Sequence, residues 1–374
     1  MKQMIYADNA ATTKLDIEAY EAMKPYLLDN YANASQPYSF SREVKKALKE
    51  SREIIARCIN AEPEEIYFTS GGTESDNWAI KGIAYNDSSR NAIITSNIEH
   101  HAVLNSCRQV ERLGVPVAYV SANEEAVITP EILKKFITKQ TKLVSVMMAN
   151  NEVGSIQPIK ELCKIAHDSG AIFHTDAVQA VGHIPVNVKT LGVDLLSASA
   201  HKFNGPKGVG FLYIKNGTNI IEHESGGQQE MSLRAGTENI ASIVGMAIAL
   251  ENNCKDLVKN SKHIIEIEKY FKSLLAGSTL DFLINGARDH IPGNVSLSFK
   301  YSDGEMLLHR LDLLGIMIST GAACDSKNTR VSHVLQAIKV PEEYAKGTIR
   351  LSFGKYNSLK DAEIIANSLL QILS

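Results

Sequence analysis

The first candidate for chemistry is Lys202, which follows one of the apolar, strand-like runs of the sequence. It lies in SASAHKFNGPKG (residues 197–208), after two polar neighbours, Ser199 and His201, and before a Gly-Pro loop. A lysine that forms a Schiff base must be kept out of bulk water and must lose its proton easily. The alternative is an ordinary surface lysine, but the strand before it and the rigid loop after it favour the Schiff-base role.

A second segment, TSGGTESDN (residues 69–77), has the composition of a phosphate-binding turn. A strand ends, two glycines turn the chain, and a helix begins near Thr73. Glycines let the backbone approach an anion closely, and a helix N-terminus offers free N–H groups and the positive end of the helix dipole. Gly72 and Thr73 are therefore candidate phosphate ligands. The alternative is a tight strand–helix turn with Thr73 as its N-cap.

A third segment, FHTDAVQ (residues 173–179), places Asp176 at the C-terminal end of a buried strand, where open α/β sheets bind ligands. A buried carboxylate needs a partner, and a pyridinium nitrogen is one. The alternative is an aspartate that caps the following helix. Together the three segments supply a phosphate grip, a ring-nitrogen carboxylate and a Schiff-base lysine, which are the groups that pyridoxal phosphate (PLP) requires.

Cys324 has the most unusual setting of the five cysteines. The five are scattered and contain no C-x-x-C, which argues against a disulfide framework or a zinc ribbon. The segment STGAACDSKN (residues 319–328) is small and polar, so its thiol should be reachable. A reactive thiol needs exposure and a lowered pKa, which Lys327 and Arg330 favour and Asp325 opposes. Alone, Cys324 would be an ordinary loop cysteine; beside a PLP signature it is a candidate sulfur acceptor.

Short apolar runs alternate with helical patterns through most of the chain. Strands are expected at residues 66–70, 92–96, 115–120, 143–149, 171–176, 194–199 and 209–214, and helices at residues 102–113, 130–137 and 159–167. Several runs are apolar on both faces, which is typical of strands buried in a mostly parallel sheet. Repeated strand–helix–strand units predict a layered α/β domain with helices on both faces.

From about residue 241 the pattern changes to a smaller α+β region. A long helical stretch (241–275), broken near residue 252, precedes strands at residues 294–300, 316–319 and 348–353 and helices at residues 304–314 and 359–373. The predicted organisation is an N-terminal segment (1–15) that packs with the small domain, a large PLP-binding α/β domain (16–255) and a small C-terminal α+β domain (256–374) that carries Cys324.

Composition gives little reason to expect nucleic acid or a membrane as partner. Charged residues make up 22% of the chain, its formal net charge is -3, and no apolar run approaches the length of a membrane span. The N-terminus lacks the apolar region of a secretory signal, so a cytoplasmic location is expected.

Nine motifs, spread over nearly the whole chain, carry a family resemblance. In chain order they are YADNAATT, TSGGTESDN, IEHHAVL, MANNEVGS, HTDAVQAVG, SASAHKFNGPKG, RAGTEN, STGAACDS and TIRLSFGK. The chain resembles the fold-type-I, class V aminotransferase-like PLP enzymes and, within them, the cysteine desulfurases of the NifS/IscS type. The resemblance implies a PLP-dependent homodimer that takes sulfur from L-cysteine, releases L-alanine and leaves a persulfide on Cys324. The sulfur then passes to an acceptor protein, for iron–sulfur cluster assembly or thio-modification.

Matched position by position, the resemblance implies a set of cofactor ligands. Lys202 matches the Schiff-base lysine, Asp176 the partner of the ring nitrogen, and Gln179 the hydrogen-bond partner of the phenolate oxygen. The residues that match the phosphate-binding set are Gly72, Thr73, Ser199, His201 and, from the other subunit, Thr237.

The resemblance also implies a catalytic histidine and a substrate-binding pair. His100 matches the histidine that stacks on the cofactor ring, with its neighbour His101 as the alternative. Adjacent histidines lack the i, i+4 spacing of helical metal ligands, so no metal is expected. Asn151 and Arg350 match the substrate-binding pair, and Arg350 suits a bidentate grip on a carboxylate. The alternative for Arg350 is a half-exposed residue on an edge strand.

Two other functions remain as alternatives. One is different class V PLP chemistry, such as that of a selenocysteine lyase or an aminotransferase, which the cysteine-bearing loop disfavours. The other is a non-catalytic sulfur-relay scaffold of the same fold, which the intact lysine, aspartate and cysteine disfavour. The chain departs from the family in having Asp325 after the cysteine, and residues 33–39 lack the family's histidine.

Overall fold

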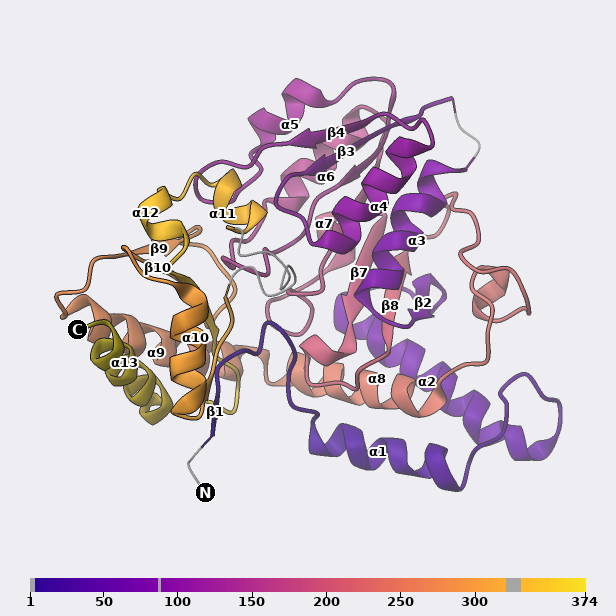
Figure 1. Ribbon diagram of the computed structural model, residues 1–374. Coiled ribbons are helices and arrows are strands. Elements are labelled where there is room, and N and C mark those ends of the chain that lie inside the picture. Colours follow the sequence, from indigo (N-terminus) through magenta and orange to yellow (C-terminus); the bar gives the residue numbers. More distant parts are fainter. Residues whose placement is uncertain (1–3, 87–88, 321–330) are drawn as a thin grey trace.

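The computed structural model describes residues 4–86, 89–320 and 331–374. Within these residues, one large sheet and one small sheet organise two units, as Figure 1 shows. This arrangement confirms the expected class, an α/β layer structure with a smaller α+β region. No helix among the described residues is long and apolar enough to cross a membrane.

The large sheet, as far as the described residues form it, has seven strands in the order β2-β8-β7-β6-β5-β3-β4. The neighbours from β7 through β4 pair in parallel, whereas β8 is antiparallel to both β7 and β2. The strands β2 and β7 therefore run in the same direction, and their carboxyl ends meet at the same edge. The bounds are Ile66–Thr69 (β2), Ala92–Ser96 (β3), Val117–Val120 (β4), Thr141–Ser145 (β5), Ile172–Asp176 (β6), Leu195–Ser199 (β7) and Gly210–Ile214 (β8).

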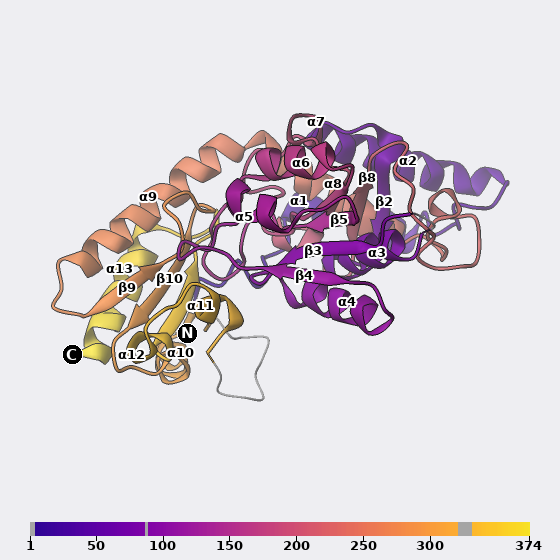
Figure 2. The same ribbon diagram turned by 90° about the horizontal axis from the view of Figure 1, so that it is seen from above.

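Both faces of this sheet are buried against helices. On β5, Leu143 packs in one apolar cluster with Trp78 and Val103, whereas the next residue, Val144, packs in another cluster with Leu162. Successive side chains of a strand point to opposite faces, so the two clusters are the two cores of a three-layer unit. Figure 2 shows α3 and α4 on one side of the sheet and α6 and α8 on the other. The helices of this unit are α1 (Ile17–Leu28), α2 (Arg42–Ile59), α3 (Gly72–Ala84), α4 (His101–Arg112), α5 (Pro130–Phe136), α6 (Ile159–Asp168), α7 (Val188–Leu191) and α8 (Ile240–Lys255).

The small unit has its own core around an antiparallel sheet of the order β12-β10-β9. Its elements are α9 (Leu257–Ala276), β9 (Phe282–Asn285), β10 (Asn294–Phe299), α10 (Gly304–Leu313), α12 (Glu342–Ala345), β12 (Thr348–Ser352) and α13 (Leu359–Leu373). Helix α11 (His333–Ala337) instead packs through Val334 and Leu335 against Met147 of the large unit. The N-terminal strand β1 (Ile5–Tyr6) pairs in parallel with β11 (Ile316–Met317), and Ile5 lies in the small core. Asp256 separates α8 from α9, at the predicted domain boundary. The division into 1–15, 16–255 and 256–374 stays a prediction.

A buried ion pair joins α2 to the segment that precedes α8. The guanidinium of Arg52 binds both carboxylate oxygens of Glu230 at 2.7 and 2.8 Å, and Glu230 also accepts the backbone N–H of Phe68 at 2.9 Å. Glu230 and the two residues after it all have positive φ angles, a conformation that ordinary residues rarely adopt. The ion pair therefore stabilises a strained turn against the first strand of the large sheet.

We expect Arg52→Met to lower the free energy of unfolding by about 3–5 kcal/mol, because it leaves the Glu230 charge buried without its partner. The side chains of Arg52 and Glu230 are only 16% and 4% exposed. Lys49→Met is the matched control on the same helix, since its side chain is 79% exposed. Urea unfolding of both variants is the measurement, and equal small losses in the two would contradict a structural role for the pair.

Candidate active site

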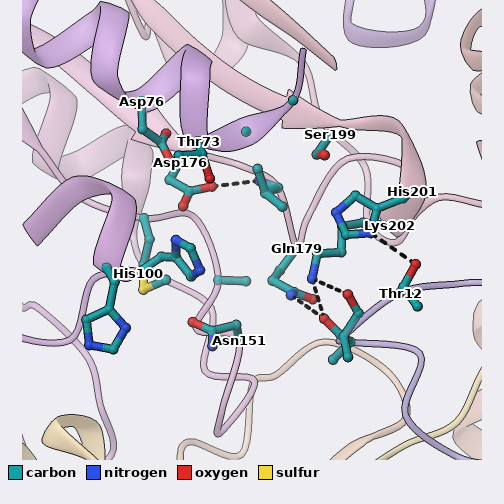
Figure 3. Close-up of a pocket in the computed structure, with 18 of the residues that line it drawn as sticks. Thr12, Thr73, Asp76, His100, Asn151, Asp176, Gln179, Ser199, His201 and Lys202 are labelled. Atoms are coloured by element: carbon teal, nitrogen blue, oxygen red, sulfur yellow. Dashed lines mark hydrogen bonds between the residues drawn. The ribbon is translucent and has the colours of Figure 1, made fainter. Parts of the chain in front are cut away.

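A cavity of about 610 Å³ lies at the edge where the carboxyl ends of the strands meet. It collects residues that the sequence spreads over more than 270 positions, and Figure 3 shows several of their side chains around it. The predicted site residues that line it are Gly72, Thr73, His100, Asn151, Asp176, Gln179, Ser199, His201, Lys202 and Arg350. The structure thus brings these residues together, while their individual roles stay predictions.

The glycine turn after β2 forms one wall of the cavity and leaves no room for side chains. A Cβ on Gly72 would lie 2.5 Å from Cγ2 of Val178, and Gly71 has a φ of 146°. A Cβ on Gly71 would lie 3.4 Å from the hydroxyl of Ser199, so the turn and the end of β7 are close neighbours. Helix α3 begins at Gly72, with Gly71 at the N-cap position. Thr73 lies inside the helix, and its interpretation as the N-cap is wrong.

Asp176, the last residue of β6, is buried and lines the cavity. Its Oδ1 accepts the backbone N–H of Val178 at 2.9 Å, in a turn that no helix directly follows among the described residues. The interpretation of Asp176 as a helix cap is therefore wrong. Burial raises the pKa of this carboxyl to about 6, although the Val178 N–H and the charge of Lys202 lower it. A positively charged ligand group would restore the ionised form.

A second buried acid, Asp76, lies beside this carboxyl and also lines the cavity. Burial, and secondly the charge of Asp176, raise the pKa of Asp76 well above its usual value. Its Oδ1 lies 3.7 Å from Nε2 of His174 and has no hydrogen-bond partner among the described residues. Asp76 was not predicted as a site residue, although the i, i+3 spacing from Thr73 within TSGGTESDN puts both on one helix face.

The N-terminal segment holds Lys202 in place. The Nζ of Lys202 donates to the carbonyl oxygens of Ala10 and Ala11 at 2.6 and 2.8 Å, and Nε2 of Gln179 donates to the Ala10 carbonyl at 2.9 Å. Thr12 also contacts Nδ1 of His201, at 3.1 Å through its hydroxyl. The motif YADNAATT therefore forms part of the site. In the sequence it had indicated only the family resemblance. Figure 3 shows these hydrogen bonds as dashed lines.

Three histidines line the opposite wall. His100 is the N-cap of α4, and its Nδ1 accepts the backbone N–H of Ala102 at 3.1 Å, which places the ring proton on Nε2. Burial and then the charge of Lys202 lower the pKa of His100 to about 4, so the ring is neutral near pH 7. His101 also lines the cavity, and its ring lies 5.0 Å from that of His333. His333 also lines the cavity and was not predicted from the sequence.

Arg350 and Asn151 lie together, as the resemblance implied. Nη1 of Arg350 donates to the carbonyl oxygen of Asn151 at 2.8 Å, and Nη2 donates to Oδ1 of Asp8 at 2.6 Å. Arg350 is only 5% exposed, so its interpretation as a half-exposed edge residue is wrong. Its Nε has no hydrogen-bond partner among the described residues, which leaves a buried donor for a ligand.

Two predicted residues lie elsewhere. Cys324 falls in residues 321–330, outside the described residues. Thr237 is described, is exposed, and lies apart from the cavity lining that the described residues form. Its predicted contact comes from another subunit, so this position leaves the prediction open.

The described residues fit PLP in their chemistry and their shape. The glycine turn and Ser199 make a cradle that a Cβ would fill, the buried Asp176 suits a protonated ring nitrogen, and Lys202 lies in the same cavity. Among the described residues, no group of three or more His, Cys, Asp or Glu side chains could hold a metal ion.

The buried Asp176 makes the apoprotein sensitive to pH. Its folded pKa of about 6 exceeds the usual 3.8, so the folded state binds a proton that the unfolded chain releases. The stability from this group is present below about pH 4 and is lost as the pH rises to about 6, by about 3 kcal/mol. We expect Asp176→Asn to flatten the fall in stability of the apoprotein between pH 4 and 6, as urea unfolding would measure.

The exposed Asp312 gives the matched control, and Asp312→Asn should keep the pH dependence of the unmodified apoprotein. Equal slopes for Asp176→Asn and the unmodified apoprotein would show that Asp176 is ionised in the fold throughout this range.

Comparison with known proteins shows the family of the chain. Residues 5–365 match the model of the family described as aminotransferase class-V. The chain is 49% identical to a cysteine desulfurase IscS of Dictyoglomus turgidum, covering all of this chain and 95% of that protein, and 43% identical to one of Methanosarcina thermophila, covering 99% and 92%. A solved NifS-like protein matches with a TM-score of 0.94 and 36% identity over 99% of each chain. A structure described as SspA in complex with cysteine matches with a TM-score of 0.84 and 32% identity, over 94% of this chain and 99% of that one.

The chain therefore belongs to the aminotransferase class-V family, whose members are PLP enzymes. Within that family it is a member of the cysteine desulfurases of the IscS and NifS-like kind, as its full-length identity of 49% and 43% to the two IscS enzymes shows.

Proposed function

We propose that this cysteine desulfurase acts on L-cysteine in the cavity described above, releases L-alanine and delivers the sulfur through Cys324 to an acceptor protein. The observation that carries the proposal is the meeting of Lys202, Asp176 and the Gly71–Gly72 turn in one cavity with Arg350. These groups come from four separate parts of the chain, and PLP chemistry on an amino acid needs all of them.

We propose that different residues of the cavity bind different parts of PLP. Gly72, Thr73, Ser199 and His201 hold the phosphate, with Thr237 of a second subunit completing the set. Asp176 binds the ring nitrogen, Gln179 the phenolate oxygen, and His100 the ring face. When bound, PLP supplies an electron sink for bond breaking at the α-carbon of the substrate.

Arg350 and Asn151 are the proposed anchors of the substrate carboxylate. Asp8 and the Asn151 carbonyl already orient two nitrogens of the guanidinium, at 2.6 and 2.8 Å, so the group loses little freedom when a carboxylate binds its remaining donors. A charge-assisted contact with a buried arginine is among the stronger polar interactions in proteins.

Lys202 and His100 are the proposed proton carriers. The lysine amine, once free, can move a proton at the substrate α-carbon. The low pKa of His100 keeps its ring neutral near pH 7, and a neutral imidazole can accept a proton at its bare nitrogen after a change in orientation. We propose that it takes the proton of the substrate thiol.

Cys324 is the proposed nucleophile toward the substrate sulfur. Attack by its thiolate would form a sulfur–sulfur bond, break the carbon–sulfur bond of the substrate and leave a persulfide on Cys324. The support is the motif STGAACDS together with the described residues of the cavity. The acceptor protein and the homodimer rest on the resemblance, and the exposure of Thr237 is compatible with a second subunit there.

The direct test is to incubate the PLP-loaded enzyme with L-cysteine and a thiol reductant and to measure alanine and sulfide. We expect equal amounts of both, with turnover. Release of pyruvate and ammonia without alanine would replace the proposal with a different class V lyase chemistry. No product from L-cysteine, in a preparation with full cofactor absorbance, would assign the site to another substrate.

We expect Arg350→Lys to raise the KM for L-cysteine by about 10–100-fold, because a lysine cannot reproduce the fixed fork of hydrogen bonds. The cofactor absorbance should be unchanged, since Arg350 is not among its proposed ligands. Arg57→Lys is the matched control, because the Arg57 side chain is 63% exposed and pairs with Glu251 at the surface. A KM equal to that of the control would remove Arg350 from substrate binding.

A further inference from the structure

Two cysteines outside the cavity lie against each other on neighbouring helices. Cys58 is near the end of α2 and Cys254 near the end of α8, and both are only partly buried. Sγ of Cys254 lies 4.0 Å from the carbonyl oxygen of Cys58. The helices also contact each other one turn away, where Arg57 pairs with Glu251 at 3.3 Å. The two cysteines thus lie next to each other on packed helices and not in a loop.

The environment makes the two thiols unequal. The neighbouring side chain of Cys58 lowers the pKa of Cys254, although burial and the charge of Glu251 oppose the shift. The side chain of Cys254 and burial raise the pKa of Cys58. One thiol that ionises more easily, next to a second thiol that stabilises it, is the arrangement that thiol–disulfide exchange uses.

The other described cysteines lack this combination. Cys107 and Cys163 are buried in the two cores of the large unit, and burial raises the pKa of Cys107 to about 12. Cys163 has a histidine neighbour, His167, at 3.7 Å, but is only 1% exposed and cannot meet a reagent. Among the described residues, a partly exposed thiol pair therefore occurs only at Cys58 and Cys254.

We propose that Cys58 and Cys254 form a redox-active dithiol, which closes to a disulfide by exchange with a low-molecular-weight disulfide such as glutathione disulfide. The Cys254 thiolate attacks one sulfur of the reagent, forming a mixed disulfide and releasing one thiolate. Cys58 then loses its proton and attacks Sγ of Cys254, which forms the Cys58–Cys254 bond and releases the second thiolate. Two protein thiols are oxidised, one small disulfide is reduced to two thiols, and a dithiol reductant reverses the reaction.

The proposed disulfide lies close to the junction between the large and the small unit. Cys254 is two residues before Asp256, where α8 ends and α9 begins, and α9 packs in the core of the small unit through Ile267 and Phe271. The disulfide would tie this junction to α2, a helix of the large unit. Neither cysteine lines the cavity, so the bond would form without altering a proposed ligand of PLP.

The test is to treat the PLP-loaded enzyme with glutathione disulfide and to measure its intact mass and its disulfide-linked peptides. The Cys324→Ser background removes the thiol of the proposed nucleophile. We expect loss of two hydrogens, no retained glutathione, a peptide that links residues 58 and 254, and full reversal by dithiothreitol. Cys58→Ser in the same background is the matched control and should retain one glutathione on Cys254.

Two results would overturn the proposal. One is retained glutathione on Cys254 in the presence of Cys58, which would mean that Cys58 cannot reach the mixed disulfide. The other is the absence of any change in mass in both proteins, while the cofactor absorbance shows that both are folded, which would mean that Cys254 is not reactive.

Discussion

Lys202→Ala is expected to lower the turnover of L-cysteine to alanine by about 10³–10⁴-fold, because it removes the group that moves protons at the α-carbon. It also removes the proposed covalent link to PLP. Borohydride reduction followed by peptide mass spectrometry should find the reduced cofactor on the peptide that contains residue 202 of the unmodified enzyme. The same treatment of Lys202→Ala should find none.

Lys207→Ala is the matched control for this experiment. Lys207 lies five residues further along and also lines the cavity, but it is exposed. Its replacement should leave the covalent cofactor and most of the turnover in place. Reduced cofactor attached to Lys207, or to any lysine in the Lys202→Ala variant, would reject the assignment of Lys202.

The elements that position Lys202 were predicted from the sequence because their signals are local. The strands expected at residues 66–70, 171–176 and 194–199 appear, within one residue at their ends, as β2, β6 and β7. The run expected at residues 143–149 is shorter in the structure, where β5 ends at Ser145. Residues 146–149 are apolar and buried at the cavity edge, but they lie beyond the end of the strand. An apolar run indicates burial, and burial alone does not distinguish a strand from a buried turn.

The small unit was predicted less completely. The long helical stretch breaks at Asp256 and not near Asn252, and β9 (Phe282–Asn285) was not expected at all. Leu283 and Ile284 of β9 are both partly exposed, so the alternation of buried and exposed residues that marks a strand is missing there. Tertiary pairing with β10 decides the structure of this segment.

The contacts that complete the site had no sequence signal. The carbonyl oxygens of Ala10 and Ala11 bind Lys202 across about 190 positions, and a backbone carbonyl is the same atom in every residue. The pairing of Asp8 with Arg350 joins positions 342 apart. The sequence therefore predicted many of the side chains that line the cavity, while the groups that orient them became known only from the fold.

The two buried acids, Asp76 and Asp176, also bear on cofactor binding. Burial raises the pKa of both Asp76 and Asp176, and the charge of Asp176 raises the pKa of Asp76 further. A protonated ring nitrogen next to Asp176 would reverse this balance, because an opposite charge favours the ionised acid. Ionised Asp176 destabilises the apoprotein above about pH 6, and the same negative charge would strengthen the binding of a protonated cofactor ring.

Cys324→Ser is expected to lower alanine release by about 10³-fold, equivalent to about 4 kcal/mol of transition-state stabilisation, because a serine hydroxyl is not ionised near neutral pH. The cofactor absorbance should remain, since none of the residues that face the cavity in the described structure changes. Mixing with L-cysteine should still shift that absorbance, because substrate binding precedes attack on its sulfur.

Cys254→Ser is the matched control, assayed under reducing conditions, and it should retain the activity of the unmodified enzyme. Alkylation followed by mass spectrometry should find an added sulfur on residue 324 of the unmodified enzyme and of the control after one turnover, and none on Cys324→Ser. Equal alanine release by Cys324→Ser and the control would mean that sulfur leaves the substrate without a protein nucleophile. Persulfide on another cysteine of the Cys324→Ser variant, with undiminished turnover, would transfer the role to that thiol.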